Sequence, residues 1–329
     1  MRAWQITRLA EPREALELRD IEIPVRGAGE LRVRVLAAAV NFPDVLMCRG
    51  IYQVRPDLPF TLGLELCGEV IEACPTDDRF AVGDRIMGMA KPPSGSFADE
   101  AIMLSTSAFA VPPELTTEEA AGFTVAYQTA WTALHRRAGI RRGETLLVTA
   151  AAGGVGSAAV QLGRAAGARV IAVVGGQAKV KAAEALGAHV VIDRHSDDVV
   201  ERIKEATGGG GVDVVVDPVG GAAYAWATKC IAFEGRIVVI GFAGGTIQQA
   251  ATNHLLVKNY AVLGLHWGLY RQRDPALVRK AHGELTALAA AGAVRPAVSE
   301  VLPFGDAVAG LTRLGAGLTT GRLVVLPPD

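Results

Sequence analysis

The sequence is poor in cysteine, and the four cysteines that it has are widely spaced. They form no C-x-x-C pair and no cysteine–histidine cluster with metal spacing. Neither a disulfide framework nor a cysteine-rich zinc module is therefore predicted. Reduced thiols are typical of a cytoplasmic protein, which is the location we expect. The four are Cys48, Cys67, Cys74 and Cys230.

Net charge and long apolar runs are also missing. The formal net charge of −1 gives no electrostatic reason to expect nucleic acid as a partner. No apolar stretch reaches about 18 residues without a charge or a turn, so the sequence predicts no membrane span. The first residues, from Met1 to Thr7, are strand-like and lack the apolar run of a signal peptide.

What the chain does have is enough apolar sequence for two domains. Half of its 329 residues are hydrophobic, and a chain of this length is expected to form about two domains. The first part is rich in short strands, such as the alternating run from Leu31 to Leu36, separated by turns that contain glycine and proline. This pattern predicts a compact β-barrel-like domain.

Strands and helices alternate in the second part of the chain. Buried apolar strands that alternate with helices predict a parallel sheet covered on both faces, and six strands match a complete Rossmann sheet. A helical stretch is expected over 113–138, before this alternation begins. The predicted strands are 145–150, 169–174, 189–193, 212–217, 236–241 and 261–265, and the main helices are 157–166, 177–186, 197–207, 222–233 and 275–291.

The run from Ala150 to Gly156 is the most informative segment, because it joins an apolar strand to a helical pattern. Gly153 and Gly156 match the second and third glycines of the G-x-G-x-x-G dinucleotide motif. Such glycines let the backbone approach a pyrophosphate, whose charge the first N–H groups of the helix bind. The alternative is a glycine-rich turn that binds nothing. The predicted contacts are Ala152, Gly153, Gly154, Val155 and Gly156.

Motifs along nearly the whole chain are shared with one family. They are Asn41-Phe-Pro-Asp44, Arg49-Gly-Ile-Tyr52, Leu62-Gly-Leu-Glu65, Val82-Gly-Asp-Arg85, Gly95-Ser-Phe-Ala98, Ala150 to Gly156 with Gln161, Asp217-Pro-Val-Gly-Gly221 and Thr320-Gly-Arg322. With them the chain resembles the zinc-independent quinone oxidoreductase branch of the medium-chain dehydrogenase/reductase superfamily. The resemblance implies an α/β fold, a Rossmann doubly wound parallel sheet plus a GroES-like β-rich catalytic domain. The NADP-binding domain is expected at 125–266, and the catalytic domain at 1–124 and 267–329.

The chain departs from zinc-dependent relatives at the positions of their metal ligands. Those relatives carry a cysteine where this chain has Asn41 and a histidine where it has Leu64, and neither residue is a plausible zinc ligand. Their structural zinc lies in a four-cysteine lobe, whereas residues 90–95 here contain no cysteine. We therefore expect no metal. Without a Lewis acid to ionise an alcohol, hydride delivery to an electron-poor acceptor is the better hypothesis.

The expected cofactor is NADPH, because the usual acid of NAD sites is missing after the second Rossmann strand. No acid appears between Arg169 and Ala183. In the resembling family, the lysine that matches Lys179 meets the 2′-phosphate, and Gly175 leaves room for it. Arg194 is expected as a second contact, whereas a solvated lysine is the alternative for Lys179.

The resemblance also implies a pocket around the nicotinamide. In the family, the residues matching Asn41 and Tyr52 line this pocket, where either side chain can donate a hydrogen bond to an acceptor oxygen and Tyr52 can also give a proton. The alternatives are a turn asparagine and a half-buried loop tyrosine. Thr129 and Phe242 match residues beside the nicotinamide. Arg322 is expected to approach cofactor phosphate or the seam between the domains.

The leading hypothesis is therefore an NADPH-dependent reductase of quinones. One alternative is a reductase of α,β-unsaturated carbonyls, namely an enal, an enone or an enoyl thioester, because these also accept hydride on a conjugated system. A second alternative is an NADPH-binding protein with little turnover. The expected partners are a small conjugated acceptor and, from the resemblance alone, a second copy of the chain that pairs through the edge strand 261–265.

Overall fold

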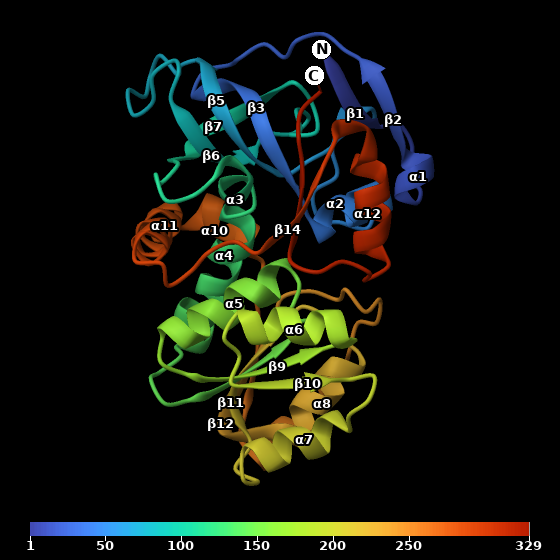
Figure 1. Ribbon diagram of the computed structural model, residues 1–329, viewed down its shortest axis with the longest axis vertical. Coiled ribbons are helices and arrows are strands. Elements are labelled where there is room, and N and C mark those ends of the chain that lie inside the picture. The colour runs from blue at the N-terminus through green and yellow to red at the C-terminus, as the bar shows by residue number, and fades with distance from the viewer. Residues whose placement is uncertain (329) are drawn as a thin grey trace. The chain divides into compact units, whose positions relative to one another are not determined.

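The computed structural model describes residues 1–328, which form two compact units (Figure 1). Unit 1 contains Met1–Val125 and the segment that begins at Arg295, and unit 2 is Ala126–Val294. The first boundary lies one residue from the predicted one. The second differs, because residues 267–294 belong to unit 2.

Helix α11 (Pro275–Ala290) accounts for this difference, since it packs on residues of helix α4 (Thr124–Trp131) that lie in unit 2. The ring nitrogen Nδ1 of His282 lies 3.3 Å from Nε2 of Gln128. The indole N–H of Trp131 donates to Glu284 at 3.0 Å. These contacts join the segment after the sixth strand to the start of unit 2.

Unit 2 is built on one sheet of six parallel strands. Their order across the sheet is β10-β9-β8-β11-β12-β13, which is the doubly wound arrangement that the alternation of strands and helices predicts. Every neighbouring pair in the sheet is parallel. The strands are β8 (Thr145–Thr149), β9 (Arg169–Val174), β10 (Val190–Asp193), β11 (Val212–Asp217), β12 (Ile231–Val239) and β13 (Ala261–Gly264).

Alternating side chains of these strands bury both faces of the sheet. Leu146 and Val170 lie against Gly163 of helix α5 (Gly154–Ala165), where a Cβ would lie only 2.4 Å from Leu146. Leu147 and Ile171 belong instead to a core cluster with residues of α7 (Val199–Ala206) and α8 (Ala222–Cys230). Figure 1 accordingly shows α5 and α6 (Gln177–Ala185) on one side of the sheet and α7 and α8 on the other.

The remaining helices are short or irregular, and the first of them lies in unit 1. The stretch predicted as one helix over 113–138 is divided into three pieces. Helix α3 (Thr117–Ala121) ends at Gly122, α4 follows, and a π-helical segment (Thr132–Ala138) ends at Gly139, whose φ of +60° is left-handed and favours glycine. Helices α9 (Thr252–Lys258) and α10 (Trp267–Arg273) flank β13 in the sequence.

Unit 1 is a β-rich domain with a small closed barrel. Its larger sheet has the order β14-β15-β3-β5-β6-β7, and a further pairing of β3 with β7 closes four of these strands on themselves. A smaller sheet has the order β2-β1-β4. The strands are β1 (Arg2–Ile6), β2 (Leu16–Asp20), β3 (Glu30–Val40), β4 (Phe60–Thr61), β5 (Glu65–Glu72), β6 (Arg85–Ala90), β7 (Glu100–Ala110), β14 (Val298–Leu302) and β15 (Arg322–Val325).

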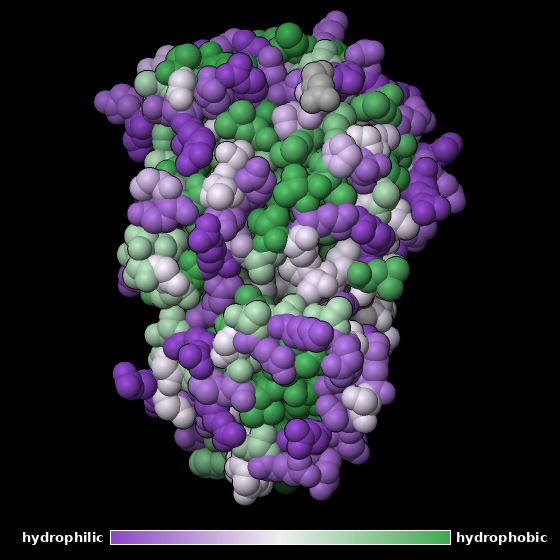
Figure 2. Space-filling view, in the orientation of Figure 1, coloured by the Kyte–Doolittle hydropathy of each residue, from purple (hydrophilic) through white to green (hydrophobic). Residues whose placement is uncertain are grey.

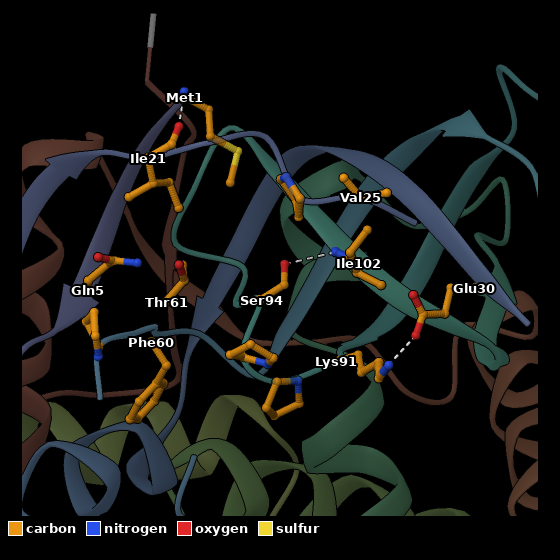
Figure 3. A pocket seen from close by; sticks show the side chains of 14 residues that line it. Met1, Gln5, Ile21, Val25, Glu30, Phe60, Thr61, Lys91, Ser94 and Ile102 are labelled. Atoms are coloured by element: carbon orange, nitrogen blue, oxygen red, sulfur yellow. Dashed lines mark hydrogen bonds and ion pairs between the residues drawn. The ribbon is translucent and has the colours of Figure 1, made fainter. Parts of the chain in front are cut away.

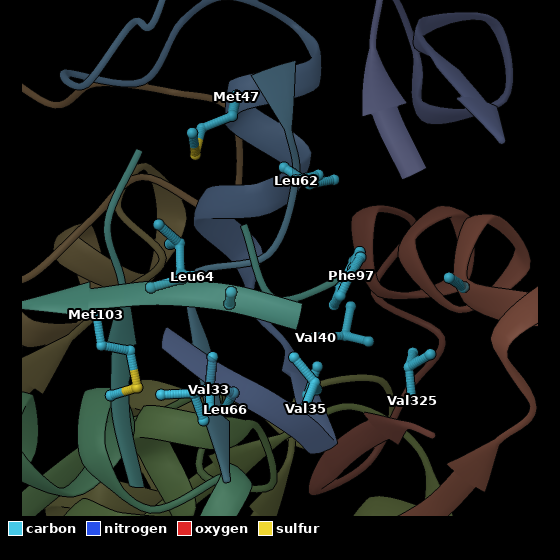
Figure 4. Packing of buried hydrophobic residues seen from close by; sticks show 14 of the residues in the cluster. Val33, Val35, Val40, Met47, Leu62, Leu64, Leu66, Phe97, Met103 and Val325 are labelled. Atoms are coloured by element: carbon cyan, nitrogen blue, oxygen red, sulfur yellow. The ribbon is translucent and has the colours of Figure 1, made fainter. Parts of the chain in front are cut away.

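Branched and aromatic side chains from these strands form the core of unit 1 (Figure 4). Helices α1 (Pro12–Ala15), α2 (Phe42–Cys48) and α12 (Ala307–Gly315) pack beside it. Leu64, which stands where zinc-dependent relatives carry a histidine, is buried in this cluster with Met47 and Leu62. The position therefore serves the packing of the domain.

The surface carries a mixture of residue types. Figure 2 shows hydrophilic and hydrophobic residues interspersed on one face. Within the part of the chain that the structure describes, no helix combines the length and the apolar character needed to cross a membrane.

Candidate functional site

The glycine turn of unit 2 lies at the carboxyl end of β8, where the backbone bends sharply into α5. Ala150 has a positive φ of 48°. A Cβ on Gly156 would lie 2.2 Å from the carbonyl oxygen of Ala150, so only glycine lets the helix approach the strand so closely. A Cβ on Gly153 would meet that oxygen alone, at 3.3 Å. Gly156 is thus required by packing, whereas Gly153 borders open space.

This turn presents backbone donors to that space. Helix α5 begins at Gly154, with Gly153 as its N-cap, so its first N–H groups have no carbonyl partner within the helix. Such a helix start suits the negative charge of a pyrophosphate. The structure brings the five predicted residues of the turn together: Ala152, Gly153, Gly154, Val155 and Gly156.

A group of cations lies at the ends of the two neighbouring strands. Strands β9 and β10 are paired so that Asp193 stands beside Val174, and the loops that follow both strands are therefore adjacent. A Cβ on Gly175 would lie 2.8 Å from Nε of Arg194. Burial lowers the pKa of Lys179, and the nearby guanidinium of Arg194 lowers it further. The structure thus brings the predicted residues Gly175, Lys179 and Arg194 together.

The same loops hold two residues that the sequence did not single out for the site. His195 lies against Gly175, on which a Cβ would be 2.9 Å from Nε2 of the imidazole. The sequence predicted no acid after β9, the second Rossmann strand. Asp193, the last residue of the neighbouring strand β10, nevertheless places an acid beside the end of β9. Its Oδ1 accepts hydrogen bonds from the N–H groups of Gly176 at 2.8 Å and His195 at 3.0 Å, and these lower the pKa of the carboxyl. The pairing of β10 with β9 brings His195 and Asp193 to the loop after β9, and the sequence alone does not show this pairing.

Two predicted residues of unit 2 lie on other elements. Thr129 is buried on α4, and Phe242 follows β12 with 39% of its surface exposed. Their contact with a nicotinamide stays a prediction.

The predicted residues of unit 1 meet in a buried polar cluster. Strands β15 and β3 are antiparallel with Leu323 opposite Val40, which places Arg322 next to Asn41. The guanidinium donates through Nη1 to Oδ1 of Asn41 at 3.0 Å and through Nη2 to Glu65, with which it forms an ion pair. Gly122 lies against Arg322, and a Cβ there would be 3.0 Å from Nε. Arg322 therefore links β15, β3 and β5 inside unit 1.

Asn41 is held on all sides within this cluster. Its Nδ2 donates to the carbonyl of Ala39 and to Glu65, both at 3.2 Å. Its backbone N–H donates to Asp44 at 2.8 Å, closing the first turn of α2. Only 3% of Asn41 is exposed. Its predicted hydrogen bond to an acceptor, and the predicted contact of Arg322 with cofactor phosphate, stay predictions; the structure adds that both side chains already have partners in unit 1.

Two buried carboxyl groups share the single guanidinium of this cluster. Burial raises the pKa of Asp44 to about 8, and the nearby Glu65 contributes to the increase. Burial also raises the pKa of Glu65, opposed by Arg322 and by the N–H of Val125, which donates to Glu65 at 2.7 Å. With a pKa of about 8, Asp44 mostly carries its proton at neutral pH, whereas Glu65 lies in an ion pair with Arg322.

This arrangement makes the stability of the protein depend on pH through Asp44. The folded pKa of about 8 lies above the ordinary value of 3.8, so the free energy of unfolding is expected to fall as pH rises from about 4 to about 8. The slope is about 1.4 kcal/mol per pH unit. Asp44→Asn keeps an oxygen for the N–H of Asn41 and should remove this slope, as measured by urea unfolding at several pH values. The exposed control Asp57→Asn should keep the slope, and equal slopes in Asp44→Asn and the parent would contradict the assignment.

Tyr52 lies in the loop after α2 and is partly buried against the core of unit 1. Its carbonyl accepts a hydrogen bond from Nε of Arg55 at 3.0 Å. A pocket position for its side chain stays a prediction.

The donor set of unit 1 does not suit a metal ion. The position of one zinc ligand in the relatives is Leu64, in the apolar core, and that of another is Asn41, whose amide is bonded to Arg322 and Glu65. A guanidinium beside Glu65 would repel a divalent cation. Among residues 1–328 no group of three or more histidine, cysteine, aspartate or glutamate side chains has an arrangement that could hold a metal ion.

Unit 1 also contains a cavity of about 290 Å³ that none of the predicted site residues lines (Figure 3). Two pairs of its polar groups bond to one another. The ammonium of Lys91 forms an ion pair with Glu30, and Oγ of Ser94 accepts from the N–H of Ile102 at 3.0 Å. The other walls are mainly apolar and proline-rich, including Pro59 and Phe60. Nothing in this lining selects a ligand.

Comparison with known proteins gives matches in both units. A family model described as "Alcohol dehydrogenase GroES-like domain" matches residues 27–113, and one described as "Zinc-binding dehydrogenase" matches residues 154–282. Quinone oxidoreductase-like protein 2 of Bos taurus is 36% identical over 297 residues, which cover 90% of this chain and 84% of the bovine protein.

Solved structures agree over nearly the full length. A mycobacterial protein complexed with NADPH superimposes with a TM-score of 0.92 at 31% identity, covering 99% of this chain and 100% of the other. A quinone oxidoreductase of Pseudomonas syringae pv. tomato gives 0.91 at 30% identity, covering 99% of each chain.

The fold and the site therefore define a dehydrogenase or reductase with a Rossmann sheet and a GroES-like β-rich domain, and the predicted fold class is confirmed. The chain belongs to the quinone oxidoreductase branch of the medium-chain dehydrogenase/reductase superfamily. It is an oxidoreductase of that superfamily.

Proposed function

We propose that the protein is an NADPH-dependent reductase that delivers hydride to a small conjugated acceptor, and that this acceptor is a quinone. The observation that carries the proposal is the pairing of a glycine turn at the start of α5 with a group of cations after β9 and β10. The relatives add support, since one solved structure holds NADPH and another is a quinone oxidoreductase.

The residues of unit 2 suit the shape and charge of NADPH. The open space at Gly153 and the N–H groups of α5 fit a pyrophosphate. The cations Lys179 and Arg194 fit a 2′-phosphate, which the 2′-hydroxyl of NADH lacks. Thr129 and Phe242 are proposed neighbours of the nicotinamide. When bound, NADPH supplies the hydride.

Asn41 and Tyr52 are proposed to orient the acceptor. Because the amide of Asn41 is held by Glu65 and Arg322, its direction is fixed before any acceptor arrives. A hydrogen bond from Tyr52 to an acceptor oxygen would favour negative charge on that oxygen. Asn41 could do the same only by moving one of its two N–H donors from Ala39 or Glu65 to the acceptor. A quinone can take its protons from water after reduction, so neither residue has to act as a proton donor.

We further propose that the reaction uses no metal. In unit 1, Arg322 supplies the positive charge beside Glu65, and Leu64 stands where zinc-dependent relatives carry a ligand. A conjugated acceptor is already electron-poor, so hydride transfer to it does not depend on a Lewis acid.

A homodimer through β13 is proposed as well. Strand β13 ends the six-stranded sheet, so one side of it lacks a neighbouring strand among residues 1–328. Helix α9, which precedes this strand in the sequence, exposes Leu256 and Val257, at 77% and 78%. A second copy would cover these groups, which sedimentation would detect as a doubled mass.

The four cysteines are all free and buried, in keeping with the proposed cytoplasmic location.

An acceptor panel tests the proposed function. With NADPH in excess, we expect oxidation of the cofactor by benzoquinones and naphthoquinones at rates well above those with enals, enones or enoyl thioesters. Tyr52→Phe should lower kcat/KM for a quinone only several-fold, because a neutral hydrogen bond contributes about 0.5–1.5 kcal/mol. Faster turnover of an unsaturated carbonyl, together with a loss of kcat/KM near a thousandfold in Tyr52→Phe, would indicate a reductase of α,β-unsaturated carbonyls instead. No oxidation with any acceptor would favour a binding role.

A further inference from the structure

His195 occupies a defined place at the edge of the Rossmann sheet. The N–H of Arg194 donates to the carbonyl of Val174 at 2.9 Å, which ties the loop after β10 to the end of β9. The next N–H, that of His195, donates to Asp193. The backbone of His195 is therefore fixed by the same carboxyl that holds Gly176.

The imidazole lies over the two glycines that begin the loop after β9. A Cβ on Gly175 would be 2.9 Å from Nε2 of His195, and one on Gly176 would be 3.9 Å from Nδ1. Nε of Arg194 is equally close to Gly175, at 2.8 Å from the same Cβ position. Any side chain at residue 175 would thus displace both groups, and glycine keeps the space over this loop for them.

Positive charge collects around this space. Lys179, on the first turn of α6, is close enough to Arg194 for the guanidinium to contribute to the lowered pKa of the ammonium. The acids nearby are turned to the backbone: Asp193 accepts from Gly176 and His195, and Asp197 accepts from the N–H of Asp193 at 2.9 Å. Two cations and an imidazole gathered at one loop favour an anion, although the Asp193 carboxylate beside them offsets part of the charge.

We propose that His195 is a third contact of the 2′-phosphate of NADPH, beside Lys179 and Arg194, and so helps to select NADPH over NADH. This rests on the proposed use of NADPH but not on the identity of the acceptor. The imidazole donates a hydrogen bond to a phosphate oxygen from Nε2 or Nδ1. NADH presents only a hydroxyl at this point and gains much less from the contact.

Binding measurements on the whole chain test this without turnover. We expect His195→Ala to weaken NADPH binding about tenfold, as one lost hydrogen bond to a charged group predicts, and to change NADH binding less than about twofold. Adenosine 2′,5′-bisphosphate should lose affinity by the same factor as NADPH, while adenosine 5′-monophosphate should not. His195→Lys, which restores a cation, should keep most of the NADPH affinity.

Two comparisons make the result specific. Lys181→Ala removes an exposed charge from the same helix and should leave both affinities unchanged, whereas Lys179→Ala should weaken NADPH alone, by about tenfold to a hundredfold. Equal effects of His195→Ala on NADPH and NADH, or no effect on either, would overturn the role of His195 while the parent still prefers NADPH. A parent that binds both cofactors equally would overturn this role together with the proposed cofactor.

Discussion

Gly153→Val is expected to lower the affinity for NADPH by at least about a hundredfold, or about 2.7 kcal/mol, while the protein still folds. The Cβ position of Gly153 meets only the carbonyl oxygen of Ala150, at 3.3 Å, so unit 2 can accommodate a side chain with a small adjustment. The valine methyl groups would, however, occupy the open space in which the pyrophosphate is proposed to lie. Isothermal titration with NADPH measures the loss, and circular dichroism confirms the fold.

Gly156→Ala is the contrasting variant in the same turn. Its Cβ would lie 2.2 Å from the oxygen of Ala150 and 2.8 Å from the Cα of Ala151, both backbone atoms that cannot yield easily. This variant should lose stability first, with a lower melting temperature in the absence of cofactor. If Gly153→Val binds NADPH as tightly as the parent, the cofactor does not lie at this turn.

Arg322→Met is expected to lower the free energy of unfolding by about 3–5 kcal/mol, because it leaves Glu65 as a buried carboxylate without its cation. Only 5% of the Arg322 side chain and none of the Glu65 side chain is exposed, so solvent cannot take over the role of the guanidinium. Asn41 would lose a partner in the same step. Urea unfolding monitored by the fluorescence of the tryptophans gives the difference.

A double variant separates charge from packing. Arg322→Met with Glu65→Gln removes both charges and keeps an oxygen for the N–H of Val125, so it should recover much of the loss. Arg322→Lys keeps a positive charge but lacks the planar guanidinium that can bond two partners at once. Its free energy of unfolding should lie between those of the parent and Arg322→Met. If the double variant is as unstable as the sum of the two single variants, the ion pair does not act as a unit and the account of this cluster is wrong.

The sheet of unit 2 could be predicted because its strands are marked in the sequence itself. The runs from Arg169 to Val174 and from Val212 to Asp217 are apolar, bounded by glycine or charge, and the observed strands β9 and β11 have those limits. Strand β12 was less visible. It begins at Ile231 and passes through Glu234, whose φ of +56° and polar character resemble a turn, so only the second half was predicted.

Contacts between distant residues could not be predicted in the same way. Arg322 and Asn41 are 281 residues apart and meet because β15 pairs with β3 in a particular register. His195 meets Gly175 because β10 pairs with β9. A sequence shows which strands exist, but their neighbours and register depend on packing over the whole domain. The buried partners of Asn41 were missed for this reason.

We propose above all that this chain transfers hydride from NADPH to a quinone without a metal. The most direct test of this proposal uses one preparation, dialysed against strong chelator, for both metal analysis and NADPH oxidation with a small quinone. We expect zinc far below one atom per chain, undiminished turnover, and a kcat/KM for NADPH at least about tenfold above that for NADH, as a single charged contact predicts. One zinc per chain with activity lost on its removal, or no oxidation above background, would contradict the account.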